Sequence, residues 1–254
     1  MYTPERTVLT DSLMSLSKRV DCIVLPLPVS SDNVMVNTPF YKQSLPLDNL
    51  LSAIKEGGVI FGGSITPEAA SLFNKHNLET IDYLEREELS VMNAVPTAEG
   101  AVQIAMEELA TTLYGRSVLI LGMGRIAKVL IRILTGFSCK ITVAARKYSD
   151  LAWAEVYGCK GVHIRSLEPA LEDAEVLFNT VPSLLLNGER LMRLKKDCLL
   201  IDLASKPGGV DMRTAADLGI KTVWALSLPG KVAPVSAGEI IASAILNILT
   251  ERGE

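Results

Sequence analysis

The segment 117–146 constrains the fold of this chain more strongly than any other part of the sequence. It opens with an apolar, β-branched run, continues with Gly122, Gly124 and Ala127 in a Gly-x-Gly-x-x-Ala spacing, and closes with a helical stretch and a second β-rich run. A strand, a tight glycine turn, a helix and a strand in this order are typical of a dinucleotide-binding parallel sheet. The same spacing also occurs in ordinary turns without a ligand, but its position between a strand and a helix favours nucleotide binding.

The small residues of this turn have separate roles. Gly122 permits the sharp turn, Gly124 lets the backbone approach a pyrophosphate closely, and Ala127 keeps the helix near the sheet. N–H groups at the start of the helix, at its positive dipole end, attract phosphate. Arg125 would either cover the pyrophosphate or stand exposed in the first helical turn. The residues expected to hold the pyrophosphate are Gly122, Met123, Gly124, Arg125 and Ile126.

The end of the second strand indicates which dinucleotide is bound. NAD sites usually carry Asp or Glu about 20 residues after the glycines, to hold the ribose 2′-hydroxyl. Here the strand ends in Ala145, Arg146 and Lys147, Ser149 follows, and the next carboxylate is Asp150. Two cations and a hydroxyl suit a 2′-phosphate, which guanidinium binds through two parallel hydrogen bonds. We therefore expect NADP as the cofactor; the alternative is that both cations are solvated loop charges.

Composition and charge exclude several other classes of protein. The 254 residues are 48% hydrophobic and 21% charged, which suits one large or two modest domains of a soluble enzyme. The net charge of −4 predicts no nucleic-acid partner, and no apolar run reaches the ~20 residues of a membrane span. The N-terminus shows no secretory signal. Four cysteines without Cys-x-x-Cys spacing predict reduced thiols in the cytoplasm, and two isolated histidines argue against a metal site.

Strands and helices alternate along the chain, which predicts an α/β fold: a Rossmann-type doubly wound parallel sheet with a second, smaller N-terminal α/β domain. Strands are expected at 21–26, 58–63, 80–84, 117–121, 140–146, 162–164, 176–182, 199–205 and 222–226. Helices are expected at 10–19, 47–55, from 66, 97–110, 167–172 and 237–250. The expected domains are an N-terminal substrate or lid domain at 1–95, a linking helix at 96–114 that Gly115 ends, a nucleotide-binding domain at 115–236 and a final helix at 237–254. That apolar final helix would be buried in the domain or at a dimer contact, and we expect a homo-oligomer.

Ligands of such sheets lie beyond the carboxyl ends of the strands, which selects the loops at 122–127, 180–183, 203–209 and 228–234. Lys206 and Lys231 each follow a strand and are candidate catalytic cations; the Pro and Gly residues around them equally suit plain turns. Further cofactor-binding candidates are Thr180, Val181, Pro182, Leu203 and Ala204. Further substrate-binding candidates are Ser205, Pro229 and Gly230.

Two more groups of candidates precede the glycine turn. Ser64 and Thr66 stand between a strand and a helix, where free N–H groups bind anions, although Thr66 also suits a helix cap with proline after it. Asn93, Thr97 and Glu99 open the expected linking helix. Glu99 would act as a base if burial raised its pKa, or it would only compensate the helix dipole.

Six segments carry a family resemblance: 91–101 (VMNAVPTAEGA), 121–125 (LGMGR), 143–146 (VAAR), 178–182 (FNTVP), 201–211 (IDLASKPGGVD) and 228–238 (LPGKVAPVSAG). From about Asp21 onward the chain resembles the A-type chains of dipicolinate synthase from spore-forming bacteria. The resemblance implies NADP-dependent oxidation of dihydrodipicolinate to dipicolinate, partnership with a flavoprotein-like B subunit, and an N-terminal domain that closes over the nucleotide-binding domain. Family members begin with a further glycine-containing strand and helix, which are not found before Asp21 here. Either the start of this sequence has been placed late, or the protein is a shortened relative whose first sheet would lose an element and expose an edge.

In the implied reaction, a ring that bears two carboxylates becomes aromatic. The protein must hold this ring and neutralise the two negative charges. Lys206 or Lys231 would neutralise one carboxylate, N–H groups at 64–68 the other, and Glu99 would take the ring proton. Two other functions stay open. A D-2-hydroxyacid dehydrogenase shares the two-domain plan, but its catalytic His follows the last strands of the nucleotide-binding domain. This chain has no His after His163. An NADP-binding regulatory or scaffold protein without turnover is the non-enzymatic alternative.

Overall fold

The computed structural model describes residues 13–16, 20–38 and 43–253, and the chain divides into two compact units. The N-terminal unit runs to Leu89 and takes in the chain again from Ile241; the central unit is Ser90–Ile240. Both boundaries fall inside helices, α2 (Glu87–Glu108) and α9 (Pro234–Arg252). The domain limits expected from the sequence remain predictions.

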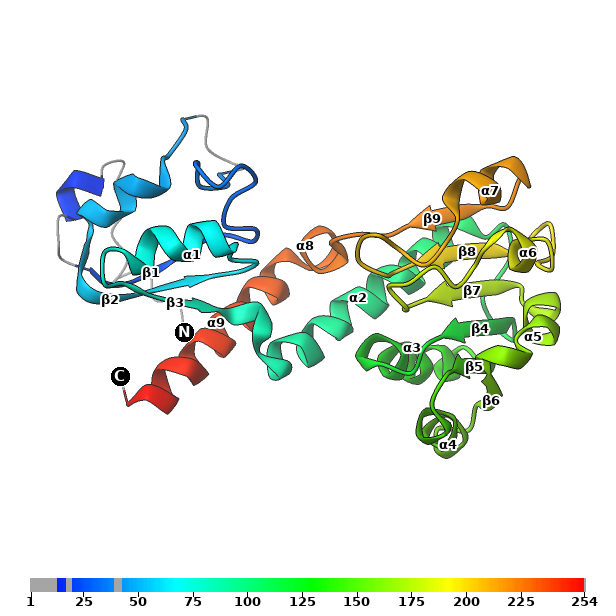
Figure 1. The fold of residues 1–254 in the computed structure, drawn as a ribbon. Coiled ribbons are helices and arrows are strands. Elements are labelled where there is room, and N and C mark those ends of the chain that lie inside the picture. Colours follow the sequence, from blue (N-terminus) through cyan, green and yellow to red (C-terminus); the bar gives the residue numbers. More distant parts are fainter. Residues whose placement is uncertain (1–12, 17–19, 39–42, 254) are drawn as a thin grey trace. The chain divides into compact units, whose positions relative to one another are not determined.

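The N-terminal unit contains a three-stranded parallel sheet in the order β1-β2-β3 (Figure 1). Its elements are η2 (Leu13–Leu16), β1 (Val20–Val24), η3 (Leu47–Ser52), β2 (Ile54–Gly62), α1 (Pro67–Asn74), β3 (Glu79–Asp82) and η4 (Tyr83–Glu85). One hydrophobic cluster, with Ile60 and Phe73 fully buried, joins β2 to α1 and η3. The expected helix at 10–19 lies mostly outside the described residues, and the helix expected at 47–55 is a shorter 3-10 helix.

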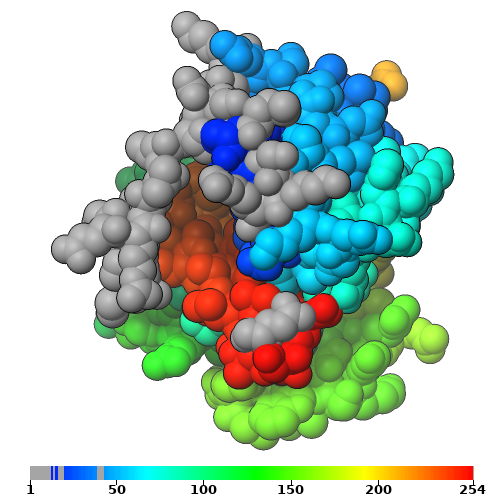
Figure 2. Space-filling view, turned by 90° about the vertical axis from the view of Figure 1, so that its left-hand side faces the viewer, coloured from blue at the N-terminus to red at the C-terminus, as the bar shows by residue number. Residues whose placement is uncertain are grey.

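The last turns of α9 belong to the N-terminal unit and are held by ion pairs. Arg252 contacts Glu79 of β3 at 2.8 Å, and Arg86 binds Glu251 through both guanidinium nitrogens at 2.7 Å. Figure 2 shows these red turns beside the blue and cyan surface of the same unit. The C-terminal part of α9 is thus part of the N-terminal unit.

The central unit contains a six-stranded parallel sheet in the order β6-β5-β4-β7-β8-β9 (Figure 1). Its strands are β4 (Ser117–Leu121), β5 (Lys140–Ala145), β6 (Lys160–His163), β7 (Val176–Asn179), β8 (Leu199–Asp202) and β9 (Thr222–Trp224). The first strand in the chain lies in the middle and the order reverses beside it, as in the Rossmann fold. The expected fold class is confirmed.

Helices cover both faces of this sheet because successive strand residues point to opposite sides. Ile120 and Phe178 pack with α2, α3 (Arg125–Gly136) and α4 (Tyr148–Val156) in one cluster. Leu121 and Leu177 pack on the other face with α5 (Glu168–Asp173), α6 (Gly188–Leu191) and α7 (Met212–Asp217). All four strand residues are fully buried.

Two local expectations were wrong. The linking helix starts at Glu87, nine residues before its expected start, with Pro96 inside it, and ends at Glu108 instead of reaching Gly115. Proline has no backbone N–H, so the helix loses one hydrogen bond at Pro96. The side chain of Pro96 is buried, and its packing accompanies that loss. The expected loop at 228–234 contains a short helix, α8 (Leu228–Val232), because proline suits a first helical turn. Trp153 of α4 is half exposed, with Lys128 over its ring.

Candidate functional site

A cavity of about 240 Å³ lies at the carboxyl ends of β4, β5, β6 and β7, where ligands of such sheets bind. We call it the carboxyl-edge pocket. Its lining residues are Gly122, Met123, Ala144, Ala145, Arg146, Lys147, Asp150, Ile164, Val181, Ser183 and Leu185. The strand-end rule and the glycine spacing placed part of this lining in the cofactor site in advance: Gly122, Met123, Ala145, Arg146, Lys147 and Val181.

The glycine turn has the geometry that a nucleotide site needs. Gly122 has φ +94°, and a Cβ there would come within 2.5 Å of the Thr180 hydroxyl, so only glycine fits. Gly124 is the N-cap of α3, and a Cβ there would meet nothing within 4 Å. The start of α3 therefore faces open space beside the N–H groups of its first turn, which suits a pyrophosphate. Arg125 and Ile126 form that first turn, with Arg125 exposed.

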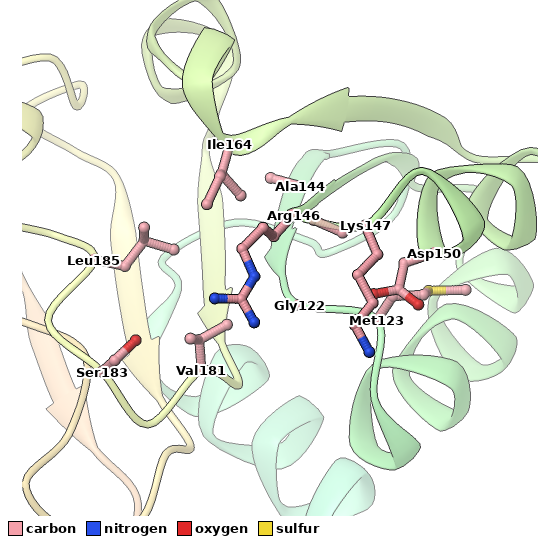
Figure 3. Close-up of a pocket in the computed structure, with 11 residues that line it drawn as sticks. Gly122, Met123, Ala144, Arg146, Lys147, Asp150, Ile164, Val181, Ser183 and Leu185 are labelled. Atoms are coloured by element: carbon pink, nitrogen blue, oxygen red, sulfur yellow. The ribbon is translucent and has the colours of Figure 1, made fainter.

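Arg146 and Lys147 stand at the exit of β5 and are both exposed. Figure 3 shows the Arg146 side chain reaching into the pocket beside Val181 and Ile164, while Lys147 passes Met123 and Asp150. Ser149 lies in the first turn of α4, also exposed. The pocket wall is therefore mainly cationic at this side, with the single carboxylate of Asp150 beside it among the lining residues.

On the opposite wall, sequence reasoning named only Val181 as a cofactor-binding candidate. Ile164 follows β6, and Ser183 and Leu185 follow β7, so they come from strand exits that the motif does not include. The strand-end rule had selected the loop at 180–183, which contains Ser183. Leu185 lies outside that loop, and nothing in the sequence pointed to it. An apolar wall of Ile164, Val181 and Leu185 suits the flat face of a base such as adenine.

A buried polar network holds the loops next to this pocket. Asp202, at the end of β8 and 1% exposed, accepts hydrogen bonds from the Asn179 side-chain amide at 2.7 Å and from two backbone N–H groups, of Ala204 and Gly209. Asn179, fully buried at the end of β7, also bonds both backbone groups of Val181. These bonds satisfy the buried groups and fix the exits of two neighbouring strands.

The candidates in these exits differ in what they expose. Thr180 donates its hydroxyl to the Leu121 carbonyl at 2.7 Å, and Pro182 is exposed. Leu203 and Ala204 have buried side chains, so only their backbone groups are available to a ligand. The side chains of Ser205 and Lys206 are exposed.

Helix α8, which carries Lys231, packs on α2 at Gly100. A Cβ on Gly100 would meet Val232 at 3.1 Å and Leu228 at 3.3 Å, so this glycine lets α8 pack closely on α2. Asn93 and Thr97 lie seven and three residues before Gly100, on the same helix face. Pro229, Gly230 and Lys231 belong to the packed helix.

Asn93 is the notable residue on that face. Its side-chain Oδ1 is buried without a hydrogen-bond partner in the described part of the chain, and its carbonyl accepts the Thr97 hydroxyl at 2.7 Å. Glu99 does not share this face. It is exposed and lines a separate groove between α2 and α3, with Val102, Met106 and Phe137.

The candidates in the N-terminal unit, Ser64 and Thr66, lie just before α1. Thr66 accepts a hydrogen bond from Ala69 N at 3.2 Å as the cap of α1, as expected, and donates to Asn33 at 2.7 Å. Ser64 is exposed in a left-handed conformation, φ +59°. Burial raises the pKa of the nearby Tyr83 to about 12, so its hydroxyl stays protonated and donates to the Leu25 carbonyl.

No cluster of His, Cys, Asp and Glu in the described residues is arranged to hold a metal ion. Within the same residues, none of the helices is long and apolar enough to cross a bilayer.

Comparisons with known proteins agree with this geometry. Residues 85–208 match the model of the D-isomer specific 2-hydroxyacid dehydrogenase NAD binding domain, and residues 2–84 match that of the N-terminal domain of the dipicolinate synthase A chain. The fold and the pocket thus define a pyridine-nucleotide-binding α/β protein of the dehydrogenase class, an oxidoreductase type.

The particular family follows from the full-length relatives. The dipicolinate synthase A chain of Bacillus subtilis is 30% identical over 235 residues, 92% of this chain and 79% of the relative. The crystal structure of its counterpart from Bacillus halodurans is 31% identical with a TM-score of 0.85, covering 91% of this chain and 80% of that one. The protein belongs to this family, the A-type chains of dipicolinate synthase.

Two other matches are narrower. A glyoxylate reductase of Thermococcus kodakarensis is 31% identical over 101 residues, 38% of this chain and 29% of the relative. A transhydrogenase structure from Sinorhizobium meliloti, 16% identical with a TM-score of 0.72, covers 93% of this chain and 75% of that one and shows a shared fold.

Proposed function

We propose that this protein oxidises dihydrodipicolinate to dipicolinate with NADP, together with a B subunit, in the cytoplasm of a spore-forming cell. The observation that carries the proposal is the carboxyl-edge pocket, with its open glycine turn and its two cations, in a member of the dipicolinate synthase family. The proposed product follows from the family to which the chain belongs, and the proposed coenzyme follows from the cations Arg146 and Lys147. The four cysteines, none in a disulfide, support the reducing compartment.

The coenzyme choice rests on charge at the β5 exit. Arg146 and Lys147 occupy the place where an NAD site carries its carboxylate, and Arg146 reaches into the pocket. Asp150 lines the same pocket four residues later and would repel a 2′-phosphate, but two cations to one anion leave a net positive site. A 2′-phosphate is therefore favoured over a hydroxyl.

The chemistry asks little of the protein as a base. The dihydropyridine loses a hydride and a proton and becomes aromatic, and the bound nicotinamide supplies the hydride acceptor. The chain must position the ring and bind its two carboxylates. Lys231 and Asn93 are the proposed carboxylate-binding pair, because α8 packs on the helix that bears the unpartnered Asn93 oxygen and an amide can turn its NH₂ group to an anion. Lys206, exposed in the loop after β8, is the alternative proposed cation for that carboxylate.

The position of Glu99 argues against its proposed role as acceptor of the ring proton. It lines the groove between α2 and α3, on another face from Asn93 and Thr97. Because the ring is proposed to bind beside Lys231 and Asn93, Glu99 is not expected to reach its proton, and Glu99→Gln should leave turnover within about twofold of wild type.

The direct test is NADPH formation from dihydrodipicolinate made in situ, with and without a B-type partner. Turnover with the partner, and its loss on omission of either NADP or substrate, is the expected result. Coenzyme binding without turnover in both conditions would favour a regulatory role instead.

Coenzyme choice is tested separately. The Arg146→Gln, Lys147→Gln double variant should lose about 100-fold in NADPH affinity and little in NADH affinity, since two charge-assisted hydrogen bonds are removed. Lys140→Gln is the matched control, because Lys140 is an exposed cation at the opposite end of the same strand. Equal loss for both coenzymes would contradict the NADP assignment.

Substrate binding is tested at Lys231. Lys231→Met should raise the KM for dihydrodipicolinate about tenfold with NADPH affinity unchanged. Unchanged turnover at low substrate concentration would exclude this lysine.

A 2-hydroxyacid substrate has less support. The glyoxylate reductase match is confined to 38% of this chain, and the two histidines of the sequence are His76 and His163. Both ring nitrogens of His163 already bond backbone groups, so it is not available as a proton shuttle.

A further inference from the structure

His163 has no part in the chemistry above, yet its imidazole makes three contacts beside the carboxyl-edge pocket. Nε2 lies 3.0 Å from the carbonyl oxygen of Arg146, and Nδ1 accepts the backbone N–H of Arg165 at 3.2 Å. The ring also stacks on Tyr148, with centroids 5.4 Å apart and planes at 28°. The parallel pairing of Ala145 with His163 places the imidazole beside the exit of β5.

The two hydrogen bonds fix the tautomer. Because Nδ1 accepts an N–H, the proton of the neutral ring must sit on Nε2, and Nε2 then donates to the Arg146 carbonyl. The imidazole therefore ties the end of β5 to η5 (Ile164–Ser166), the turn that follows β6. Ile164 lines the opposite wall of the pocket, so one side chain connects both walls.

The bonded carbonyl belongs to the peptide group that joins Arg146 to Lys147. A hydrogen bond to that oxygen holds the plane of the peptide, and with it the directions in which both cationic side chains leave the backbone. Tyr148, the next residue, begins α4 and stacks on the same ring. All three residues of the β5 exit are thus held by one imidazole.

We infer that His163 is a positioning residue for coenzyme selectivity, which aims Arg146 and Lys147 at a 2′-phosphate without touching the coenzyme. This inference rests on the proposed use of NADP. It differs from a plain structural role, because it predicts an effect on ligands that carry the 2′-phosphate and little effect on those that lack it.

Two substitutions separate the hydrogen bonds. The amide NH₂ of His163→Gln reaches about as far as Nε2 and retains a donor for the Arg146 carbonyl. The amide oxygen of His163→Asn stands near the position of Nδ1 and retains only the acceptor for Arg165 N–H. Calorimetry on the full chain, with 2′,5′-ADP and 5′-AMP as probes, compares the variants with wild type.

His163→Asn should bind 2′,5′-ADP about tenfold more weakly and 5′-AMP within twofold of wild type, whereas His163→Gln should stay within threefold for both. Equal losses in the two variants, or none in either, would overturn the inference. A wild-type chain that binds 5′-AMP as tightly as 2′,5′-ADP would contradict the NADP proposal and the inference together. A wild-type preference that survives in His163→Asn would contradict only the inference.

A second measurement needs no variant. Nitrogen NMR shifts of the imidazole should show a protonated Nε2 and an unprotonated Nδ1 near neutral pH. A protonated Nδ1 in the neutral ring would remove the donor to Arg146 and overturn the inference even if the variants failed to fold.

Discussion

Asp82 and Asp202, one in each unit, occupy matching places at the ends of parallel strands, but their surroundings differ. Each accepts two backbone N–H groups. Asp202 is 1% exposed and also binds the buried Asn179 amide, whereas Asp82 is partly exposed. The central unit thus uses buried polar groups to fix the loops next to the carboxyl-edge pocket. The N-terminal unit uses polar groups at its surface to cap its own short elements.

The cores explain this difference. The sheet of the central unit separates two hydrophobic clusters, so its strand ends are covered and a polar group there must be paired. The smaller sheet has one such cluster among the described residues, and its strand exits stay close to water. The strand exits that buried hydrogen bonds fix are therefore those of the central unit.

The largest expected effect is on Asp202. Asp202→Ala leaves one N–H of the Asn179 amide and two backbone N–H groups buried without an acceptor, so the free energy of unfolding should fall by about 3 to 4 kcal/mol. Asp82→Ala should cost about 1 kcal/mol, because water can reach its donors. Both tryptophans, Trp153 and Trp224, lie in the central unit, so urea unfolding followed by their fluorescence reports Asp202. Hydrogen exchange at β2 reports Asp82, and equal costs would contradict the comparison.

Gly209 should come next. A Cβ there would stand 2.2 Å from the Asn179 amide nitrogen and 2.5 Å from the Val181 carbonyl, so Gly209→Ala must displace the buried network. We expect a loss of about 2 to 3 kcal/mol in the same urea experiment. Gly136→Ala is the control, because a Cβ at that helical position would meet nothing within 4 Å.

Thr66 tests whether a predicted substrate residue of the N-terminal unit is only structural. Thr66→Ala removes the cap of α1 and should cost about 1 kcal/mol, measured as faster amide exchange in that helix. Thr66→Ser keeps the cap and should restore wild-type exchange. If Thr66→Ser also leaves the KM for substrate unchanged while Thr66→Ala raises it only in proportion to its lost stability, the residue serves the helix alone.

The smallest expected effect is on the acid side of the stability curve. The backbone N–H of Ser117, followed by Arg116, holds the pKa of Glu175 below its usual value. Its stabilising contribution is therefore complete above the unfolded pKa of about 4.3 and is lost as pH falls through the lowered folded pKa.

Glu175→Gln should accordingly lose less stability than wild type between about pH 5 and pH 3, with a total difference under about 1 kcal/mol. In the N-terminal unit, hydrogen bonds to Arg86 lower the pKa of Glu251, which is exposed, so Glu251→Gln should have a smaller effect. Parallel acid curves for wild type and Glu175→Gln would exclude the contribution of this carboxylate.

The strand-turn-helix at the glycine turn was predictable because its signals are local. Periodicity, small residues and strand propensity lie within 30 residues, and the same holds for the Thr66 cap. Leu185 and Ile164 were not predictable as pocket residues, since they reach the pocket only through the order in which strands pair. The start of α2 was missed because Pro96 is a breaking signal that tertiary packing overrides.

From its residue order alone, this chain determined a dinucleotide turn, the alternation that builds a doubly wound sheet, and two cations where a carboxylate is usual. These features depend on neighbours in the chain, so short-range sterics and charge suffice to specify them. Only the tertiary structure decided which exits converge, that Asn179 and Asp202 are bonded under the loops, that Glu99 and Asn93 face apart, and that His163 holds the Arg146 peptide. Those relations join residues that are not neighbours in the chain, and sheet pairing, burial and helix packing set them.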